Sequence, residues 1–230
     1  MKRLLENVLI GVFLVILMVA GYQLYKIWEV YHEAEEEYQT LQEFVKDPER
    51  EPDDTVPEEQ PDSVELESTI DFEGLRKINP DIVAWIRIEA AGIDYPVVQG
   101  KDNDYYLHHT FRGEPNIAGS IFMDYRNQGL KDEKVILYGH NMRDGSMFAK
   151  LKKLNVDDEP IAVIYTSDDI YHYKLYKEKY VPLTDEIYQL DSSTVEKNKD
   201  GLIEGSKKIL VLSTCNNDAS SRHIFKWMLF

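Results

Sequence analysis

The sequence predicts a mostly β domain, a barrel or a sandwich, placed behind an N-terminal helix that inserts into a membrane. From about Asp71 onward, eight short strand-like runs alternate with turn residues, and the helical patches between them are few. An α/β fold would need a helix after nearly every strand, so the pattern favours an all-β architecture. Upstream, residues 8–22 form an apolar run without a charged residue.

The apolar run extends to residue 25 if Gln23 is tolerated at the interface, which gives 18 residues. A helix of about 17 to 25 apolar residues spans a bilayer. Three aromatic residues typical of a membrane interface gather at its far end: Tyr22, Tyr25 and Trp28. Residues 1–25 are therefore predicted to be a membrane anchor.

The anchor is predicted to stay on the protein and to leave the domain outside the cell. A cleaved signal peptide needs small residues at its cut site, and Met18 and Ala20 fit that requirement poorly. Lys2 and Arg3 precede the span, and the acid-rich stretch follows it. The positive-inside rule places the N-terminus in the cytoplasm and the rest of the chain in the extracellular space.

Residues 26–46 are predicted to form an amphipathic stalk helix. From Leu24 onward, apolar residues recur every three or four positions among glutamates, at Leu24, Ile27, Tyr31, Ala34, Tyr38, Leu41 and Val45. This stripe could pair two chains or fold back on the domain, and folding back is the commoner outcome for a short stripe. Residues 47–70 contain four prolines among Asp and Glu, a composition typical of an unfolded linker.

The charge of the chain excludes one class of partner. The formal net charge is −16, and residues 26–73 hold 18 acidic residues against 3 basic ones, so the acidity belongs to the stalk and linker. Nucleic-acid binding depends on clustered Lys and Arg and is therefore disfavoured. The chain has one cysteine, Cys215, which excludes an intramolecular disulfide framework.

Residues 71–230 are predicted to form the folded domain. Its eight candidate strands are Val83–Ile88, Ile93–Val98, Ile117–Phe122, Lys134–Tyr138, Ile161–Tyr165, Ile170–Tyr180, Lys208–Ser213 and His223–Leu229. Its candidate helical patches are Phe72–Ile78, Asp102–His109, Met147–Leu154 and Ser192–Lys199.

Two chemistry-bearing residues follow the ends of predicted strands. Cys215 follows an apolar strand that ends in small hydroxyl residues, and His140 follows the strand that ends at Tyr138. Arg222 opens the final strand seven residues after the cysteine, and a short turn makes these two strands neighbours. Spacing alone does not bring His140 to them. If it joins them, a thiolate, an imidazole and a guanidinium make an acyl-transfer site.

Each of these residues, taken singly, also fits an ordinary structural role. A lone cysteine is commonly an inert buried side chain, a histidine in a turn is commonly solvated, and a strand arginine is commonly a rim charge. A metal site could draw on His108, His109, His140 and Cys215. It ranks below the thiol interpretation because adjacent histidines on a helix cannot both face one ion and no metal-binding spacing is present.

An ordered set of motifs then resembles a known family. The segments are Asn79–Ile86, Ile93–Gln99, Asp102–Leu107, Gly119–Asp124, Tyr138–Met142, Leu212–Cys215 and Arg222. Together they resemble the sortases, specifically class B, and they cover the whole folded part from Asp71 to Phe230.

The resemblance implies an eight-stranded β-barrel with a few short helices, one of them between the sixth and seventh strands near Ser192–Lys199. It implies a membrane-bound cysteine transpeptidase of a Gram-positive surface that uses no metal or organic cofactor. Such enzymes cleave a C-terminal sorting signal after Thr, hold the acyl group as a thioester, and pass it to an amine of a peptidoglycan precursor or a pilin. Cys215 would be the nucleophile, His140 the general acid/base and Arg222 the oxyanion and positioning group.

The resemblance also implies substrate-binding residues at Asn103, Leu107, Tyr138 and Ser213. Some relatives carry an acidic residue directly after the cysteine, where this chain has Asn216, so Asp218 is the nearest acidic candidate. Class B favours Asn-Pro-x-Thr or related signals.

Two rival functions remain. A papain-like or cell-wall cysteine hydrolase places its cysteine before its histidine, whereas here His140 precedes Cys215 by 75 residues. A non-catalytic, membrane-tethered β-domain that binds a surface protein or a wall polymer would carry a buried, unreactive Cys215. An exported free thiol argues mildly against the second rival, because exposed cysteines outside the cell are oxidised.

Overall fold

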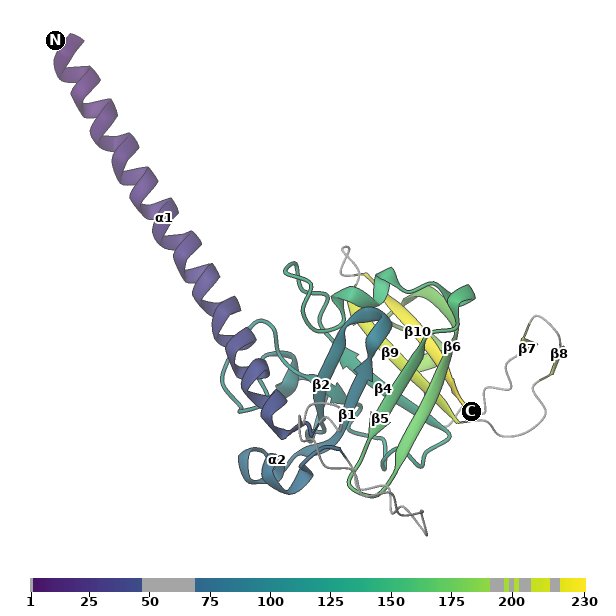
Figure 1. Ribbon diagram of the computed structural model, residues 1–230. Coiled ribbons are helices and arrows are strands. Elements are labelled where there is room, and N and C mark those ends of the chain that lie inside the picture. The colour runs from purple at the N-terminus through teal and green to yellow at the C-terminus, as the bar shows by residue number, and fades with distance from the viewer. Residues whose placement is uncertain (1, 47–68, 191–196, 199–200, 203–207, 216–219) are drawn as a thin grey trace, which may run out of the picture.

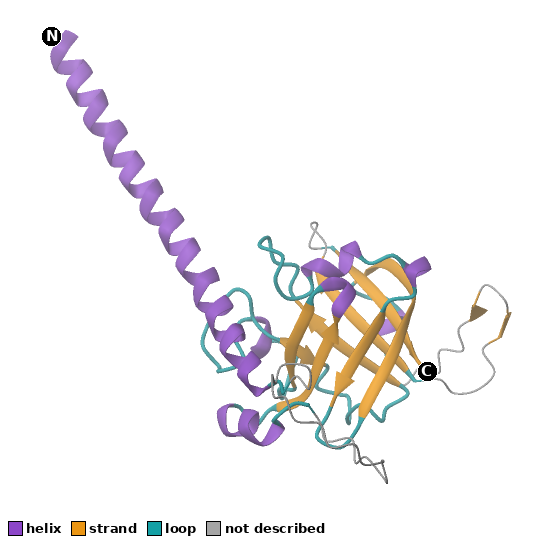
Figure 2. Ribbon diagram, in the orientation of Figure 1, coloured by secondary structure: helices purple, strands orange, loops and turns teal. Residues whose placement is uncertain are grey.

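The computed structural model describes residues 2–46, 69–190, 197–198, 201–202, 208–215 and 220–230. Eight strands close into a barrel in the order β1-β2-β3-β4-β9-β10-β6-β5, and a long N-terminal helix rises from one side of it (Figure 1). Short helical turns lie on the loops around the barrel, as Figure 2 shows. The prediction of a mostly β domain is confirmed, and the sheet is a closed barrel.

The barrel strands are β1 (Ile82–Ile88), β2 (Ile93–Val98), β3 (Ile121–Met123), β4 (Lys134–Gly139), β5 (Ile161–Tyr165), β6 (Ile170–Pro182), β9 (Ile209–Cys215) and β10 (Ser221–Leu229). A separate two-stranded sheet pairs β7 (Lys197–Asn198) with β8 (Gly201–Leu202). All barrel neighbours are antiparallel except β2 with β3 and β4 with β9, which are parallel.

The predicted strand at Ile117–Phe122 is wrong in its first four residues. Strand β3 begins only at Ile121, because a turn comes first. The Asn116 side chain accepts from the Ala118 amide, and Gly119 adopts a positive φ of 56°. A Cβ at Gly119 would lie 2.6 Å from the Tyr106 carbonyl oxygen, so this turn requires glycine.

The predicted helix at Phe72–Ile78 is confirmed as α2, whose N-cap Asp71 accepts a hydrogen bond from the Gly74 amide at 2.9 Å. Two other predicted patches are reduced to 3₁₀ turns, η3 (Tyr105–Leu107) and η4 (Ala149–Lys153). The helix expected at 192–199 lies mainly outside the described residues, and its one described part, Lys197–Asn198, is strand β7. The remaining 3₁₀ turns are η1 (Gln42–Phe44), η2 (Glu89–Ala91), η5 (Val156–Asp158) and η6 (Glu186–Tyr188).

The barrel encloses the hydrophobic core. Its largest fully buried side chains include Trp85 on β1, Trp227 and Phe225 on β10, and Phe148 on the loop after β4. A smaller cluster lies outside the barrel wall, where Ile187 of η6 packs with Val211 and Ile224. Burial on both faces of β9 explains the continuous apolar run that precedes Cys215.

Helix α1 (Lys2–Leu41) is continuous from the apolar segment to the barrel. It is long and apolar enough to cross a membrane, and none of its apolar window is buried. In the C-terminal part of α1, the predicted apolar stripe packs on the barrel through the buried side chains of Ala34, Tyr38 and Leu41. The folding-back alternative is therefore what this structure shows.

Hydrogen bonds fix α1 on the barrel along its last three turns. The Tyr38 hydroxyl donates to the Gly119 carbonyl at 2.7 Å, and the Asn116 amide donates to the Val30 carbonyl at 2.8 Å. The backbone N–H of Arg112 donates to the Glu37 carboxylate at 2.8 Å. The first of these bonds is buried and the second is half-buried, so breaking them would leave polar groups without water and the helix keeps one orientation.

The chain after α1 returns to the same place after the acidic segment. Val45 and Ile70 form a β-bridge, the Lys46 amide donates to the Thr69 carbonyl at 2.6 Å, and the Asp71 amide donates to the Phe44 carbonyl at 2.8 Å. The residues on either side of the segment 47–68 are thus held together at one point. Their length does not set the distance between α1 and the barrel.

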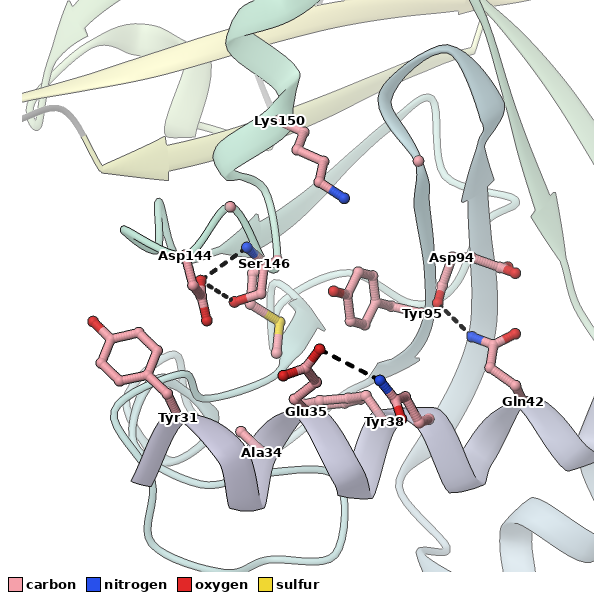
Figure 3. A pocket seen from close by; sticks show the side chains of 14 residues that line it. Tyr31, Ala34, Glu35, Tyr38, Gln42, Asp94, Tyr95, Asp144, Ser146 and Lys150 are labelled. Atoms are coloured by element: carbon pink, nitrogen blue, oxygen red, sulfur yellow. Dashed lines mark hydrogen bonds between the residues drawn. The ribbon is translucent and has the colours of Figure 1, made fainter. Parts of the chain in front are cut away.

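A pocket of about 500 Å³ lies between α1 and the barrel (Figure 3). Tyr31 and Glu35 line it from the helix, Tyr95 from β2, and Asp144 from the loop after β4. Figure 3 shows Asp144 and Ser146 near the Tyr31 end of the helical segment, whereas Asp94 lies near Gln42. The loop after β4 therefore faces the part of the docked helix that is nearest to the apolar segment.

Candidate active site

Strand pairing brings the three predicted catalytic positions to one end of the barrel. Strands β4 and β9 are parallel, and their last pair is Gly139 with Thr214. The next residue of each strand is His140 and Cys215, so these two positions are level with each other. On the other side of β9, Cys215 pairs directly with Arg222 of β10.

The His140 imidazole is half-buried and held by the backbone. Its Nε2 lies 2.7 Å from the Leu107 carbonyl oxygen. Because a carbonyl only accepts, Nε2 carries the proton in this contact, and Nδ1 is left as the nitrogen that can exchange a proton. The His140 carbonyl accepts from the Phe148 amide at 3.0 Å, which fixes the start of the following loop.

Arg222 lies between two strands, because it pairs with Cys215 on β9 and with Val181 on β6. Its Nη1 donates to the Ser221 carbonyl at 3.1 Å. The guanidinium group is a fixed fork of donors that suits a developing oxyanion or a substrate carbonyl.

A pocket of about 310 Å³ opens beside these strand ends. Its lining residues are Asn103, Leu107, Phe122, Tyr138, Gly139, His140, Leu183, Tyr188, Ser213, Thr214 and Arg222. The lining includes all four residues predicted to bind substrate and two of the three predicted catalytic residues. The third, Cys215, immediately follows Thr214 of the lining. The structure therefore gathers the predicted positions around one pocket, while their roles stay predictions.

Asp124 organises one wall of this pocket, although its own carboxylate is fully buried. The Asn103 amide donates to it at 3.0 Å, and the Tyr138 hydroxyl donates to it at 2.9 Å. Arg126 donates to both carboxylate oxygens, at 2.8 and 2.7 Å, in a bidentate ion pair. Two of the predicted substrate-binding side chains are thus held by one buried carboxylate.

Burial and these donors act on the pKa of Asp124 in opposite directions. Burial raises the pKa of the carboxyl, but the hydrogen bonds from Arg126, Tyr138 and Asn103 outweigh it and lower the pKa below its ordinary value. Burial, reinforced by the Asp124 charge, raises the pKa of Tyr138. Asp124 therefore stays ionised and Tyr138 stays a neutral donor at neutral pH.

Comparison with protein families matches residues 86–228 to the Sortase domain. The chain belongs to the sortase family. Its relatives place it in class B: "Sortase B" of Listeria monocytogenes is 37% identical over 164 residues, which are 63% of this chain and 66% of the Listeria protein. The aligned part is thus slightly under two thirds of that relative.

Solved structures of sortase B share the fold. A Bacillus anthracis sortase B in complex with AAEK1 has a TM-score of 0.67 at 29% identity, over 88% of this chain and 99% of that chain. A Staphylococcus aureus sortase B–substrate complex has a TM-score of 0.62 at 29% identity, over 69% of this chain and 84% of that chain.

Three residues at the sortase pocket were not assigned a role from the sequence: Tyr188, which lines it, and Asp124 and Arg126, which support its wall from behind. The Tyr188 hydroxyl and the Ser213 hydroxyl are 2.9 Å apart, and the Tyr188 carbonyl accepts from Arg126 at 3.0 Å. Tyr188 lies 25 positions from Ser213, so only the fold reveals this contact. Asp124 follows strand β3, and an acidic residue at a strand end was the available signal.

The other histidines of the metal alternative lie on the loop after η3. His109 stacks on Tyr105 at 4.0 Å between ring centroids, and its Nδ1 lies 2.8 Å from the Tyr105 carbonyl. His108 is exposed, 3.9 Å from Asp104. Neither His108 nor His109 lines the pocket that contains His140 and Arg222.

Proposed function

We propose that this sortase is a membrane-anchored cysteine transpeptidase that cleaves a C-terminal sorting signal after Thr and transfers the cleaved protein to an amine. The observation that carries the proposal is the strand register, which puts His140 and Arg222 on either side of Cys215 at the edge of one pocket. A nucleophile, a proton-transfer group and an oxyanion donor are the parts that acyl transfer needs.

In the first half-reaction, the Cys215 thiolate attacks the Thr carbonyl of the signal, and a carbon–sulfur bond forms. Arg222 donates to the oxyanion of the tetrahedral intermediate. The peptide carbon–nitrogen bond then breaks, and the leaving amine takes a proton from His140. The product is a thioester on Cys215 and a free C-terminal fragment.

In the second half-reaction, the acceptor amine attacks the thioester carbonyl and loses its proton to His140. The carbon–sulfur bond breaks, an amide bond forms, and Cys215 returns as the thiolate. The acceptor is an amine of a peptidoglycan precursor or of a pilin. Water attacking the same thioester would give hydrolysis instead.

The wall of the pocket at Asn103, Tyr138 and Ser213 supports binding of an extended peptide. It presents an amide, a neutral phenol and a hydroxyl beside the apolar side chain of Leu107. Few polar groups at fixed positions in a mostly apolar cleft are typical of a specific ligand site. A Staphylococcus aureus relative has been solved as a sortase B–substrate complex, which supports a peptide substrate for this chain as well.

The apolar part of α1 supports a single-pass anchor with the N-terminus in the cytoplasm and the barrel outside. Lys2 and Arg3 precede it, and the acidic residues follow it. The substrates proposed here are surface or pilin proteins that bear a sorting signal.

The test uses the full-length chain in detergent, because α1 contributes buried side chains to the fold. Quenched fluorescent peptides carrying Asn-Pro-x-Thr, Leu-Pro-x-Thr-Gly and Ser/Pro-Pro-x-Thr signals are compared, with Cys215→Ala as the control. Cleavage of one peptide, with a thioester adduct on Cys215 in the intact mass, is the expected result. A folded protein that gives neither cleavage nor adduct with any peptide would instead support the non-catalytic binding domain.

A further inference from the structure

We propose that the end of the barrel that carries the His140 pocket faces the membrane, and that the exposed side chain of Ile117 lies in the lipid interface. The inference rests on the proposed membrane anchor and adds an interaction surface to it. The partner is the outer leaflet of the bilayer that α1 crosses.

The first observation is the short distance between the apolar segment and the barrel. The apolar run ends at Tyr25, and the first hydrogen bond to the barrel among the described residues runs from Asn116 to the Val30 carbonyl. Five helical residues span about 7–8 Å. The barrel therefore begins within one and a half helical turns of the membrane interface, close to the exposed Trp28.

The second observation is that this connection is a continuous helix and not a flexible linker. Helix α1 runs unbroken through residues 25–30, and its contacts with the barrel extend from Val30 to the buried Leu41. In the turn that follows, η1, Gln42 donates to the Asp94 carbonyl at 2.9 Å. A helix fixed over about 16–17 Å transmits its orientation to the barrel. The same barrel face is therefore turned toward the bilayer in every molecule.

The third observation identifies that face. Figure 3 shows Asp144 and Ser146, on the loop after His140, beside the Tyr31 end of α1. Tyr31 is six residues after Tyr25, or about 9 Å along the helix axis. In Figure 1 the loop after β4 and the end of β9 lie on the side of the barrel toward which α1 rises. The end with the pocket is thus the membrane-facing end.

The fourth observation is an exposed apolar side chain directly after Asn116, which makes this docking contact. Ile117 follows Asn116 directly, and 55% of its surface is exposed although it lies beside a docked helix. An isolated exposed isoleucine is ordinary on a soluble surface. Ile117, however, lies beside α1, the helix that carries Trp28. At this depth an apolar side chain enters the boundary between lipid headgroups and acyl chains.

This orientation brings the site close to a membrane-tethered substrate. A sorting signal on a precursor that is still held in the bilayer, or an amine on a lipid-linked acceptor, would meet the pocket without leaving the membrane surface. Confinement of both substrates to the membrane surface would then raise their effective concentration at the pocket.

The test measures depth in proteoliposomes containing the full-length chain. In a Cys215→Ala background, single cysteines are placed at Leu14→Cys, Ile117→Cys and Asp168→Cys, and each is labelled with a fluorophore. Asp168 is an exposed residue of the β5–β6 turn, at the end of the barrel opposite to β9's last residue. Nitroxide groups attached to the lipid headgroups then quench each label according to its depth.

We expect the label at position 117 to be quenched at least about threefold more than the label at position 168. If position 14 lies in lipid but positions 117 and 168 are quenched equally, the membrane-facing surface is refuted and the anchor stands. If position 14 is also in water, the proposed anchor fails, and the inference fails with it.

A second comparison removes the docking contact. Tyr38→Ala deletes a buried ring and its hydrogen bond to Gly119, which frees the barrel to tilt, so quenching at position 117 should approach that at position 168. Thr40→Ala changes an exposed neighbour that bonds only within the helix and should leave the quenching unchanged. If quenching at position 117 is the same in the Tyr38→Ala variant as in the Thr40→Ala variant, α1 docking does not set the orientation.

Discussion

The two walls of the pocket are built differently. On one wall, the buried carboxylate of Asp124 is bonded to Asn103, Tyr138 and Arg126, so these groups have fixed positions. On the other wall, the His140 ring makes one hydrogen bond among the described residues, to a backbone carbonyl. Binding requires groups that do not move, whereas proton transfer requires a ring nitrogen, here Nδ1, that can exchange a proton with the substrate. The comparison predicts that the first wall sets KM and the second sets kcat.

The largest effect is expected from His140→Ala. Removing the imidazole should lower kcat by about 1000-fold while KM changes little, because the proton-transfer group is lost and the binding wall is intact. Steady-state cleavage of the preferred peptide measures both constants.

His109→Ala is the matched control for that variant. His109 also contacts a carbonyl of η3, that of Tyr105, but it does not line the pocket. We expect wild-type kinetics from it. Equal losses in the two variants would mean that His140 acts only by holding η3 in place.

Arg222→Lys is expected to have the next largest effect. The charge is retained but the planar fork of donors is lost, so kcat should fall by about 100-fold. Arg112→Lys, at an exposed position outside the pocket, is the control. A wild-type kcat in Arg222→Lys would limit Arg222 to a structural role between β6 and β9.

Asp124→Asn tests the binding wall. The variant keeps an acceptor but removes the charge that holds Arg126, so KM should rise about tenfold and stability should fall by about 2 kcal/mol. Asp94→Asn is the control, because Asp94 accepts from Trp85 and Arg87 outside the pocket. It should lower the stability without raising KM. A KM change in both variants would make the effect global.

The pH dependence of stability sharpens the same assignment. Because the folded pKa of Asp124 lies below its ordinary value of 3.8, its contribution is complete above that value and is lost as the pH falls through the folded pKa. The wild-type protein should therefore lose more stability than Asp124→Asn between about pH 4 and pH 2. Parallel curves from urea unfolding at each pH would contradict the depressed pKa.

The smallest effect is expected at Lys226, a buried residue of β10 that does not line the pocket. Burial, with Lys179 and Lys177 nearby, lowers the pKa of Lys226 from 10.5 to about 8. The folded state therefore binds fewer protons than the unfolded state between these values, and stability should rise as the pH increases from about 8 to 10.5. Lys226→Met should flatten this rise, measured by thermal unfolding, and leave KM unchanged. An unchanged or steeper rise would contradict the assignment.

The sequence predicted the elements whose formation depends on residues that are close together in the chain. The apolar spacing and turn residues predict seven of the eight barrel strands close to their observed positions, and Asp71 marks the start of α2. The error at residues 117–120 came from an apolar run interrupted by the turn at Gly119. The motifs also pointed to the residues that line the pocket, but only the closed barrel shows that β4 and β9 are neighbours.

Features that depend on contacts between distant residues could not be predicted. The Asp124 carboxylate is recognisable as a central acceptor only once Asn103, Arg126 and Tyr138 are placed around it. The stripe on α1 favoured folding back but left pairing with a second chain open, and nothing in residues 26–46 specifies the hydrogen bond from Asn116 to Val30. Both the Asp124 contacts and the docking of α1 depend on burial against residues that are far away in the sequence.

The bridge between Val45 and Ile70 joins the two described ends of the acidic segment to each other. In a chain whose two attachment points are already paired, doubling the length of the connecting segment costs only about 0.6 kcal/mol of closure entropy. A change in the number of residues between 47 and 68 therefore leaves Val45 and Ile70 paired beside the barrel. For protein engineering, the same position would accept an inserted reporter domain while the helix, the barrel and the site keep their arrangement.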